Sequence, residues 1–282
     1  MITDKETNTV YFSEKLKEQF PEIAGKIYST LEMLGADCRF LPCTKDIWAR
    51  DYMPVQVSEH KFIQYTFYPD YLQKYEAIKS DPVSICAGLK LKTINSDIIL
   101  DGGNVVKSDN CIIMTDKIIL ENRQTYNKEE LLNKLKELFE VEKIVLIPWD
   151  RGERYGHADG MVRFIDNETV LLQGYYNTRK DLFEVGFIES LLGSLKKNHL
   201  KYEFLNIDYP EMINAKFAYI NFLQTQDFIL LPSLGIDKDD EALEAEIRKY
   251  FPGYKDRTRK IEMNSIIAKG GALNCISWTK KE

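Results

Sequence analysis

The stretch that decides the fold lies between residues 111 and 147 and reads Cys111-Ile-Ile-Met-Thr115, Lys117-Ile-Ile-Leu120, Asn127-Lys-Glu-Glu130 and Lys143-Ile-Val-Leu-Ile147. The first two segments are short apolar runs on either side of one acidic residue, which predicts a pair of strands. Asn127 and Glu130 have the spacing of a capping box, which predicts a helix that continues to about residue 139. The last segment predicts a third strand, so the unit is a strand pair, a helix and a strand.

The same order of elements recurs along the chain. Helical patterns begin near Pro21, Tyr71 and Asp239, and another spans roughly Asp181 to Leu200. Together with the helix after Asn127, these patterns start about 50 to 57 residues apart, which is the signature of a structural repeat.

Strand-like segments accompany these helices. Phe217 to Thr225 and Phe228 to Leu231 predict a second strand pair, and Glu203 to Ile207 predicts a strand after the helix of residues 181–200. The helical pattern near Tyr71 is weaker than the others and is expected to end before Asp81-Pro82.

About five units fill the chain, and no linker rich in glycine, serine or proline divides them. We therefore predict one α/β domain over residues 1–282, in which five repeated units form a ring around a central axis. An ordinary doubly wound sheet is the alternative, although it would contain fewer hairpins.

The composition limits the class of protein. The net charge of −6 and the sequence pI near 5.4 argue against nucleic acid as the main partner. We expect a cytoplasmic protein, because no apolar run is long enough for a membrane span and no secretory signal is visible. His60 and His199 lack ligand-like spacing, so no metal is expected. The cysteines are odd in number and contain no CxxC spacing, which fits reduced thiols; they are Cys38, Cys43, Cys86, Cys111 and Cys275.

Four separate stretches carry the candidate functional residues. They are Asp46-Ile-Trp48-Ala-Arg50-Asp51, Leu100-Asp101-Gly-Gly-Asn104, Tyr155-Gly-His157-Ala-Asp159-Gly-Met-Val-Arg163-Phe164 and Lys269-Gly-Gly-Ala-Leu-Asn-Cys275-Ile-Ser-Trp278. Each has a structural interpretation when taken alone, since aspartates often cap turns and free cysteines are often small core residues. Taken together, they indicate an anionic pocket around a nucleophile, and such a pocket selects a cation.

His157 and Asp159 lie two residues apart, which would place both side chains on one face of a strand. A histidine beside a carboxylate has a raised basicity that suits proton transfer near neutral pH. The alternative is a histidine that is only hydrogen-bonded in a polar strand.

The ordered set of motifs resembles the agmatine deiminase and bacterial-type peptidylarginine deiminase family of the guanidine-modifying (pentein) superfamily. The features shared with that family are a tryptophan two residues before Arg50-Asp51, an acid-Gly-Gly-Asn turn at Asp101, a His-x-Asp-Gly segment at His157 followed by Arg-Phe, and a late Gly-Gly-x-x-x-Cys ending at Cys275. Tyr219-Ile-Asn221-Phe222 also resembles an asparagine-bearing strand of the family. The resemblance implies a five-bladed α/β-propeller.

The resemblance also implies a reaction, the hydrolysis of a guanidinium to a ureido product and ammonia without a metal or an organic cofactor. Cys275 would be the nucleophile and His157 the general acid and base. Asp51 and Asp159 would hold the guanidinium, with Asp101 contributing or placing its loop. The residues expected to bind substrate are Trp48, Arg50, Asn104, Arg163 and Asn221.

Several positions depart from the family pattern. Asn274 stands where a histidine is common before the cysteine, and Met53 stands where glycine is common. Asp101 replaces the glutamate usual in agmatine deiminases, which favours the peptidylarginine branch. However, no arginine occurs between Arg50 and Arg123 to hold a substrate carboxylate, which favours agmatine.

Three other functions stay open at this point. An amidinotransferase of the same superfamily would pass the amidino group to an amine, and a silent protein would only bind arginine-like cations. A papain-like protease could use Cys275, His157 and Asn221, although its cysteine normally lies early in the chain. The sequence also leaves a homodimer open.

Overall fold

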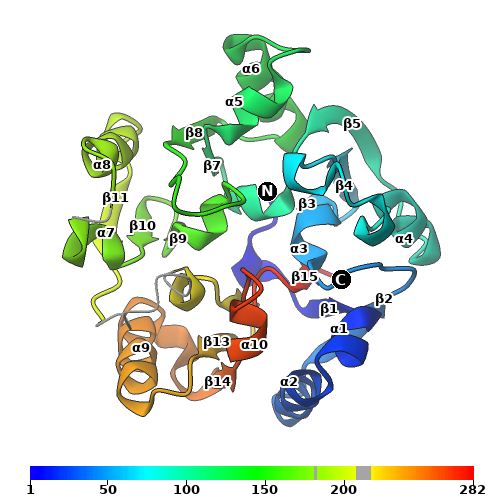
Figure 1. Ribbon diagram of the computed structural model, residues 1–282, viewed down its shortest axis with the longest axis vertical. Coiled ribbons are helices and arrows are strands. Elements are labelled where there is room, and N and C mark those ends of the chain that lie inside the picture. Colours follow the sequence, from blue (N-terminus) through cyan, green and yellow to red (C-terminus); the bar gives the residue numbers. More distant parts are fainter. Residues whose placement is uncertain (181–182, 208–216) are drawn as a thin grey trace.

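The computed structural model describes residues 1–180, 183–207 and 217–282. Five three-stranded sheets surround a common axis, and the longer helices lie on the outside of the ring (Figure 1). In every sheet the middle strand pairs antiparallel with one neighbour and parallel with the other. This arrangement is the predicted ring of repeated α/β units, and it excludes a single doubly wound sheet.

Four of the sheets are built from consecutive strands. They contain β3 (Val55–Ser58), β4 (Lys61–Thr66) and β5 (Ile94–Ile99); β6 (Val106–Lys107), β7 (Cys111–Thr115) and β8 (Lys143–Ile147); β9 (Val162–Phe164), β10 (Thr169–Leu172) and β11 (Lys201–Phe204); and β12 (Leu223–Gln224), β13 (Ile229–Ser233) and β14 (Thr258–Glu262).

The fifth sheet closes the ring, because it joins the two ends of the chain. Strand β15 (Ser277–Lys280) pairs antiparallel with β1 (Thr9–Ser13), which pairs parallel with β2 (Asp37–Leu41). The register sets Phe12 opposite Ser277. Cys275 therefore lies just before a strand that is fixed to the N-terminal strand.

Each parallel strand pair needs a crossover connection, and helices supply it. The crossovers contain α1 (Glu14–Gln19) and α2 (Pro21–Met33), α4 (Pro82–Gly88), α5 (Lys117–Asn122) and α6 (Lys128–Phe139), α7 (Tyr175–Thr178) and α8 (Phe187–Lys197), and α9 (Asp237–Tyr250). Two further short helices, α3 (Ala49–Tyr52) and α10 (Asn264–Ile267), lie outside the crossovers.

The helices predicted near Pro21, after Asn127 and near Asp239 are confirmed. The capping box before α6 is complete, with the Asn127 side chain accepting from the Glu130 amide at 3.0 Å and the Glu130 side chain accepting from the Asn127 amide at 3.1 Å. The helix expected from Asp181 begins later, at Phe187, and Asp181 itself lies outside the described residues.

The segment Lys117–Leu120, predicted as a strand, is instead part of helix α5. Its branched apolar residues favour a strand locally, but the buried positions Ile118 and Asn122 follow a helical spacing. The Asn122 side chain fixes the helix to β5, because it accepts from the Ile99 amide and donates to the Ile99 carbonyl, both at 2.8 Å. The short strand β6 takes the antiparallel position beside β7.

Two other predictions were also wrong. The segment after Tyr71 forms two 3-10 turns (Asp70–Leu72 and Glu76–Ile78), and helix α4 begins at Pro82 rather than ending before it. Proline suits the first turn of a helix, where its missing N–H costs no hydrogen bond, and Asp81 caps that turn. Phe217–Thr225 contains a 3-10 turn (Ala218–Ile220), and only the two residues of β12 form a strand.

Among the described residues, no helix is both long enough and apolar enough to cross a membrane.

Candidate active site

Cys275 lies at the axis end of a glycine-bearing loop that leads into β15. A side chain at Gly271 would overlap the ring of Trp48, so glycine lets this loop pack against that ring. Asn221 holds both the backbone and the side chain of the cysteine. Its Oδ1 accepts from the Cys275 amide at 3.2 Å and lies 3.2 Å from the sulfur. The side chain is mostly buried, with 8% of the residue exposed.

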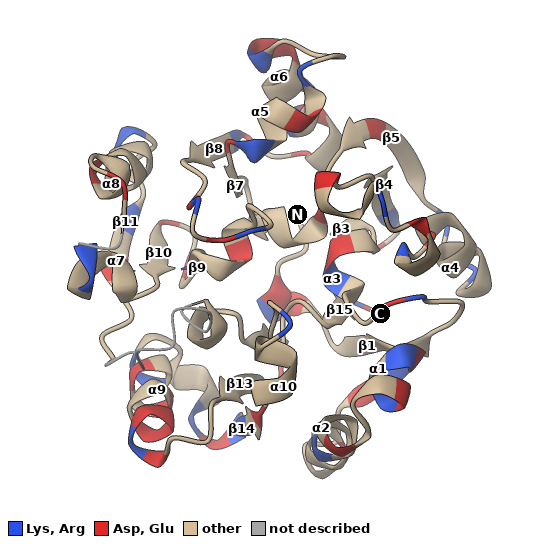
Figure 2. Ribbon diagram, viewed as in Figure 1, with Lys and Arg blue, Asp and Glu red and all other residues tan. Residues whose placement is uncertain are grey.

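A cavity of about 290 Å³ opens in front of the sulfur. Its polar lining brings Asp51, His157 and Cys275 together from three distant segments of the chain, and Trp48 also faces it. Figure 2 shows that acidic residues lie beside the central axis near α3 as well as on the outer helices. The full lining consists of Asp46, Trp48, Asp51, Phe67, Tyr71, Leu72, Tyr75, Ile78, Arg154, Tyr155, His157, Gly270 and Cys275.

His157 lies between two carboxylates. Its Nδ1 is 3.6 Å from Asp51 Oδ1, and its Nε2 is 3.0 Å from Asp101 Oδ2. Burial alone would lower the histidine pKa, but the two carboxylates outweigh burial and raise it. The carboxylates therefore favour the imidazolium form of His157, which can donate a proton.

The local structure around His157 differs from the predicted strand. Ala158–Gly160 forms a 3-10 turn, and His157 precedes it in extended conformation. His157 lines the cavity, whereas Asp159 lines a neighbouring pocket and its Oδ2 lies 3.9 Å from the Cys275 sulfur.

The glycine pair after Asp101 allows the histidine and its carboxylates to approach one another. A Cβ at Gly103 would lie 2.6 Å from His157 Nδ1 and 2.8 Å from Asp51 Oδ1. The Gly103 amide instead donates to Asp51 Oδ1 at 3.2 Å. Glycine is thus required here by close packing of the site.

Asp159 completes the surroundings of the sulfur. Its Oδ2 lies 3.9 Å from Cys275 Sγ and accepts a hydrogen bond from Asn274 Nδ2 at 2.7 Å. Burial, Asp159 and Asp51 together raise the pKa of the Cys275 thiol well above its usual range. The resting sulfur is therefore a neutral thiol, and a bound cation would favour its ionisation.

Four residues that the sequence predicts to bind substrate do not line this cavity. Arg50 donates to Asn274 at 3.1 Å, and Arg163 donates to Asp4 at 3.1 Å. Asn104 accepts from the Thr115 amide at 2.8 Å, and Asn221 contacts the nucleophile from behind. Trp48 is the member of that predicted set that faces the cavity.

Further residues line the cavity beside the predicted catalytic residues, and Tyr71 is one that the sequence offered as a possible wall for an aliphatic arm. Tyr71, on the 3-10 turn Asp70–Leu72, packs edge-on against Tyr155 with ring centroids 4.9 Å apart and lies 6.3 Å from the His157 ring. Burial raises the pKa of Asp46 to about 6, although hydrogen bonds from Trp48 and Ser80 oppose the shift. Asp46 stands in the motif quoted from the sequence, so its place could have been found there.

Lys117 supports the site from behind, and no sequence signal pointed to it. The side chain is 2% exposed, and its Nζ lies 3.0 Å from Glu121, 3.2 Å from Asp70 and 3.8 Å from Asp101. It thus connects the carboxylate behind His157 to the turn that carries Tyr71. In the described parts of the chain, no group of three or more histidine, cysteine or acidic side chains could hold a metal ion.

Comparison with known proteins agrees with this geometry. A sequence model of the family described as Porphyromonas-type peptidyl-arginine deiminase matches residues 1–280. The chain belongs to this family. A curated relative from Marinomonas sp. (strain MWYL1), named "Putative agmatine deiminase", is 24% identical over 214 residues. The match spans 65% of this chain and 57% of that relative, which is less than two thirds of the relative's length.

Solved structures of other proteins share the fold of this Porphyromonas-type family member. The agmatine deiminase of C. jejuni has a TM-score of 0.79 at 19% identity, covering 100% of this chain and 95% of its own. The agmatine deiminase of Enterococcus faecalis has a TM-score of 0.76 at 18% identity, with coverage of 100% and 95%. DDAH from Pseudomonas aeruginosa has a TM-score of 0.58 at 11% identity, with coverage of 97% and 99%. The predicted five-bladed α/β-propeller is confirmed.

Proposed function

We propose that this protein hydrolyses the guanidinium group of a small substrate to a ureido product and ammonia, with Cys275 as a covalent nucleophile. The observation that carries the proposal is the meeting of Cys275, His157 and Asp51 on one cavity. A guanidinium is flat, stays positively charged at physiological pH and donates hydrogen bonds along its edges. It therefore matches a thiol that is flanked by carboxylates. Membership of the family supports the same chemistry.

In the first half of the reaction, Asp51 and Asp159 hold the N–H groups of the guanidinium and direct its central carbon toward the sulfur. The bound positive charge offsets the carboxylates that raise the thiol pKa, so Cys275 loses its proton to solvent. The thiolate attacks the carbon and an S–C bond forms. A C–N bond then breaks as the His157 imidazolium protonates the leaving nitrogen, and ammonia departs.

In the second half, a water takes the place of ammonia. Neutral His157 accepts a proton from this water as its oxygen attacks the thiouronium carbon. The S–C bond then breaks, the hydroxyl proton of the adduct passes to solvent as the C–O bond becomes a carbonyl, and the ureido product leaves the regenerated thiolate. Asp101 holds the other side of the imidazole through both steps, since it is hydrogen-bonded to Nε2. Acid and base assistance of this kind contributes roughly 10²–10⁴ in rate.

Agmatine is the substrate that we propose first. The cavity of about 290 Å³ is at the lower end of small-molecule sites, which suits a short aliphatic guanidine. Asp46 adds a second acid to its wall, which suits a substrate with a distal ammonium. Arg154 also lines the cavity and would suit a carboxylate instead, so arginine, methylated arginines and short arginyl peptides are the rival substrates.

We also propose a cytoplasmic location and leave a homodimer open, both on the basis of the sequence. All five cysteines are free thiols, which supports a reducing compartment.

The test is a screen for ammonia release over agmatine, free arginine, methylated arginines and short arginyl peptides. We expect agmatine to give the highest kcat/KM and to yield its ureido product in equal amount to ammonia. Transfer of the amidino group to an added amine, without ammonia, would instead identify an amidinotransferase. Binding of these cations in calorimetry without any product would identify a silent binding protein.

A further inference from the structure

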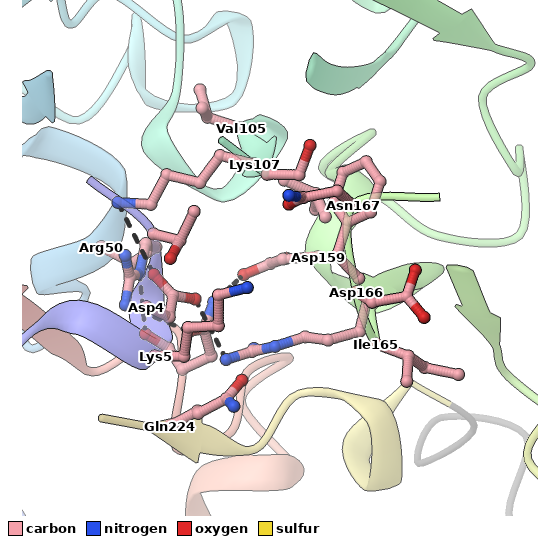
Figure 3. A pocket seen from close by; sticks show the side chains of 16 residues that line it. Asp4, Lys5, Arg50, Val105, Lys107, Asp159, Ile165, Asp166, Asn167 and Gln224 are labelled. Atoms are coloured by element: carbon pink, nitrogen blue, oxygen red, sulfur yellow. Dashed lines mark hydrogen bonds and ion pairs between the residues drawn. The ribbon is translucent and has the colours of Figure 1, made fainter. Parts of the chain in front are cut away.

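Three polar side chains form a continuous series behind the nucleophile. Arg50 Nη2 donates to Asn274 Oδ1 at 3.1 Å, and Asn274 Nδ2 donates to Asp159 Oδ2 at 2.7 Å. Asn274 and Asp159 are 4% and 3% exposed, so water does not compete at these atoms. Figure 3 shows Arg50 and Asp159 reaching the same pocket from different elements.

The chemistry of the three groups fixes the direction of the series. An arginine side chain only donates hydrogen bonds, and an ionised carboxylate only accepts them. The residue between them must accept on one side and donate on the other. The amide of Asn274 does both, and its two neighbours dictate which way the amide points.

We propose that Arg50 and Asn274 are positioning residues, which act through Asp159 to hold its carboxylate beside the sulfur of Cys275. This inference rests on the proposed deiminase function, in which Asp159 holds the guanidinium. It also answers the departure from the family pattern at this position. A neutral imidazole carries one donor and one acceptor, so asparagine can fill the place of the histidine that is common before the cysteine.

Arg50 also fixes the backbone that carries the nucleophile. Its Nε donates to the Asn274 carbonyl at 3.3 Å, and its backbone N–H donates to the Cys275 carbonyl at 3.1 Å. Asn221 contacts the Cys275 amide on the other side. Arg50 and Asn221 therefore both hold the backbone of residues 274 and 275. The same segment carries the Cys275 sulfur and, through the Asn274 side chain, contacts the Asp159 carboxylate.

The short helix α3 carries both Arg50, which holds residues 274 and 275, and Asp51, which lines the cavity. Arg50 and Asp51 are adjacent on it, yet Asp51 faces the cavity while Arg50 points behind the sulfur. On the same side of the sulfur, Asp4 pairs with Arg163 at 3.1 Å and with Lys107 at 3.6 Å, while Arg50 donates to Asn274.

The test uses Asn274→Ala, Asn274→Asp, Asn274→His and Arg50→Met, with ammonia release from the best guanidine as the assay. We expect kcat/KM to fall about 10²-fold in Asn274→Ala and Arg50→Met, because the carboxylate loses its orientation. Asn274→Asp should lose more, since it places two carboxylates in contact. Asn274→His should stay within about tenfold of the natural protein.

A second readout needs no substrate. The rate of Cys275 alkylation by iodoacetamide is measured against pH in the same variants. Without the amide donor, Asp159 carries a less compensated charge, so the half-maximal rate should move to higher pH in Asn274→Ala and return in Asn274→His.

Asn122→Ala is the matched control, because it removes another buried amide whose hydrogen bonds are made to Ile99 and Ile118. It should lower stability while leaving kcat and the alkylation profile unchanged. Activity of Asn274→Ala within threefold of the natural protein, or a loss in Asn274→His as large as in Asn274→Ala, would overturn the proposal. If the natural protein releases no ammonia from any guanidine, the deiminase function fails, and the alkylation profiles still decide for or against the positioning role.

Discussion

The two sides of Cys275 have opposite electrostatic character. On the cavity side, Asp46, Asp51 and the carboxylate behind His157 leave an excess of acids around a neutral thiol. On the other side, Arg50 and Lys107 lie near Asp4 (Figure 3). Burial would disfavour the charge of Asp4, but Lys107, Arg163 and Arg50 hold its pKa at about 2. Asp159 lies between the two regions.

This difference in charge indicates that the cavity side of Cys275 performs the chemistry and that the other side has a structural role. The cavity side keeps carboxylates that lack enough cations, so it perturbs the pKa values of Cys275 and His157 and has room for a positive substrate. The rear cluster, formed by Asp4, Lys107 and Arg163, pairs its charges internally. Substitutions in the two regions should therefore fail in different ways.

The largest effect is expected at the nucleophile itself. Cys275→Ala should lower kcat for ammonia release by at least about 10⁴-fold, because none of the other described residues that line the cavity carries a thiol. Its free energy of unfolding, measured by urea denaturation, should change by less than about 2 kcal/mol. A folded Cys275→Ala protein that still turned over would remove the covalent mechanism.

The next effect is expected at the acid and base. His157→Gln should lower kcat by roughly 10²–10⁴-fold, because it removes proton transfer to the leaving ammonia. Steady-state kinetics on the folded variant measures it. A loss confined to KM would assign His157 to binding and would weaken the account of the cavity side.

The rear cluster should respond in stability instead. Asp4→Asn should lower the free energy of unfolding by about 2 kcal/mol, which corresponds to the drop of the Asp4 pKa from 3.8 to about 2. Because the folded pKa is lowered, this stabilisation is present above pH 3.8 and is lost as the pH falls toward 2. The control is Lys15→Ala, which breaks the Lys15–Glu18 pair at the surface and should cost less than about 1 kcal/mol. Equal losses in the two variants would show that the ion pairs of Asp4 stabilise the fold no more than a surface pair does.

The pH dependence of Cys275 alkylation tests the electrostatic character of the cavity side directly. Since the thiol pKa is raised, the rate with neutral iodoacetamide should be low at pH 7 and should rise with pH beyond 9. A cationic haloacetamidine should react at least about tenfold faster than iodoacetamide at pH 7, relative to a free thiol, because its charge offsets the carboxylates. Asp51→Asn should raise the iodoacetamide rate at pH 7. A rate independent of pH between 6 and 9 would show that the thiol is not held neutral.

The smallest effect is expected at the cavity wall. Arg154→Ala should raise kcat/KM for agmatine by about two- to threefold, since it removes a positive charge near a doubly charged substrate. The same change should abolish any turnover of guanidines that carry a carboxylate. Arg151→Ala is the control, because that guanidinium stacks 4.0 Å from the Trp149 ring and does not line the cavity. A fall in agmatine turnover for Arg154→Ala alone would contradict the proposed substrate.

Much of the ring could be predicted from the sequence, because its signals are local. The capping box at Asn127 and the alternation of apolar runs with helical patterns repeat in each unit. The strand predicted at Lys117–Leu120 was wrong, because the structure of this segment depends on contacts that are not local in sequence. Its residues favour a strand by local preference, while contacts between Asn122 and Ile99 stabilise a helix.

In the site, too, local patterns could be predicted from the sequence and contacts between distant segments could not. The motifs around Asp51, His157 and Cys275 were found because each is compact in sequence. The partners of Asp4 could not be found, since Asp4 and Arg163 are 159 residues apart and meet only when the ring closes. The direction in which Arg50 points depends on the same closure, because Asn274 reaches it from the other end of the chain.

The measurement that tests the central claim most directly is the intact mass of the protein, quenched with acid during turnover of its best guanidine substrate. We predict an adduct equal in mass to the substrate less one ammonia, located by peptide mapping on Cys275 and absent from Cys275→Ala. Steady turnover with no adduct on Cys275, or an adduct on another residue that persists in Cys275→Ala, would contradict the account.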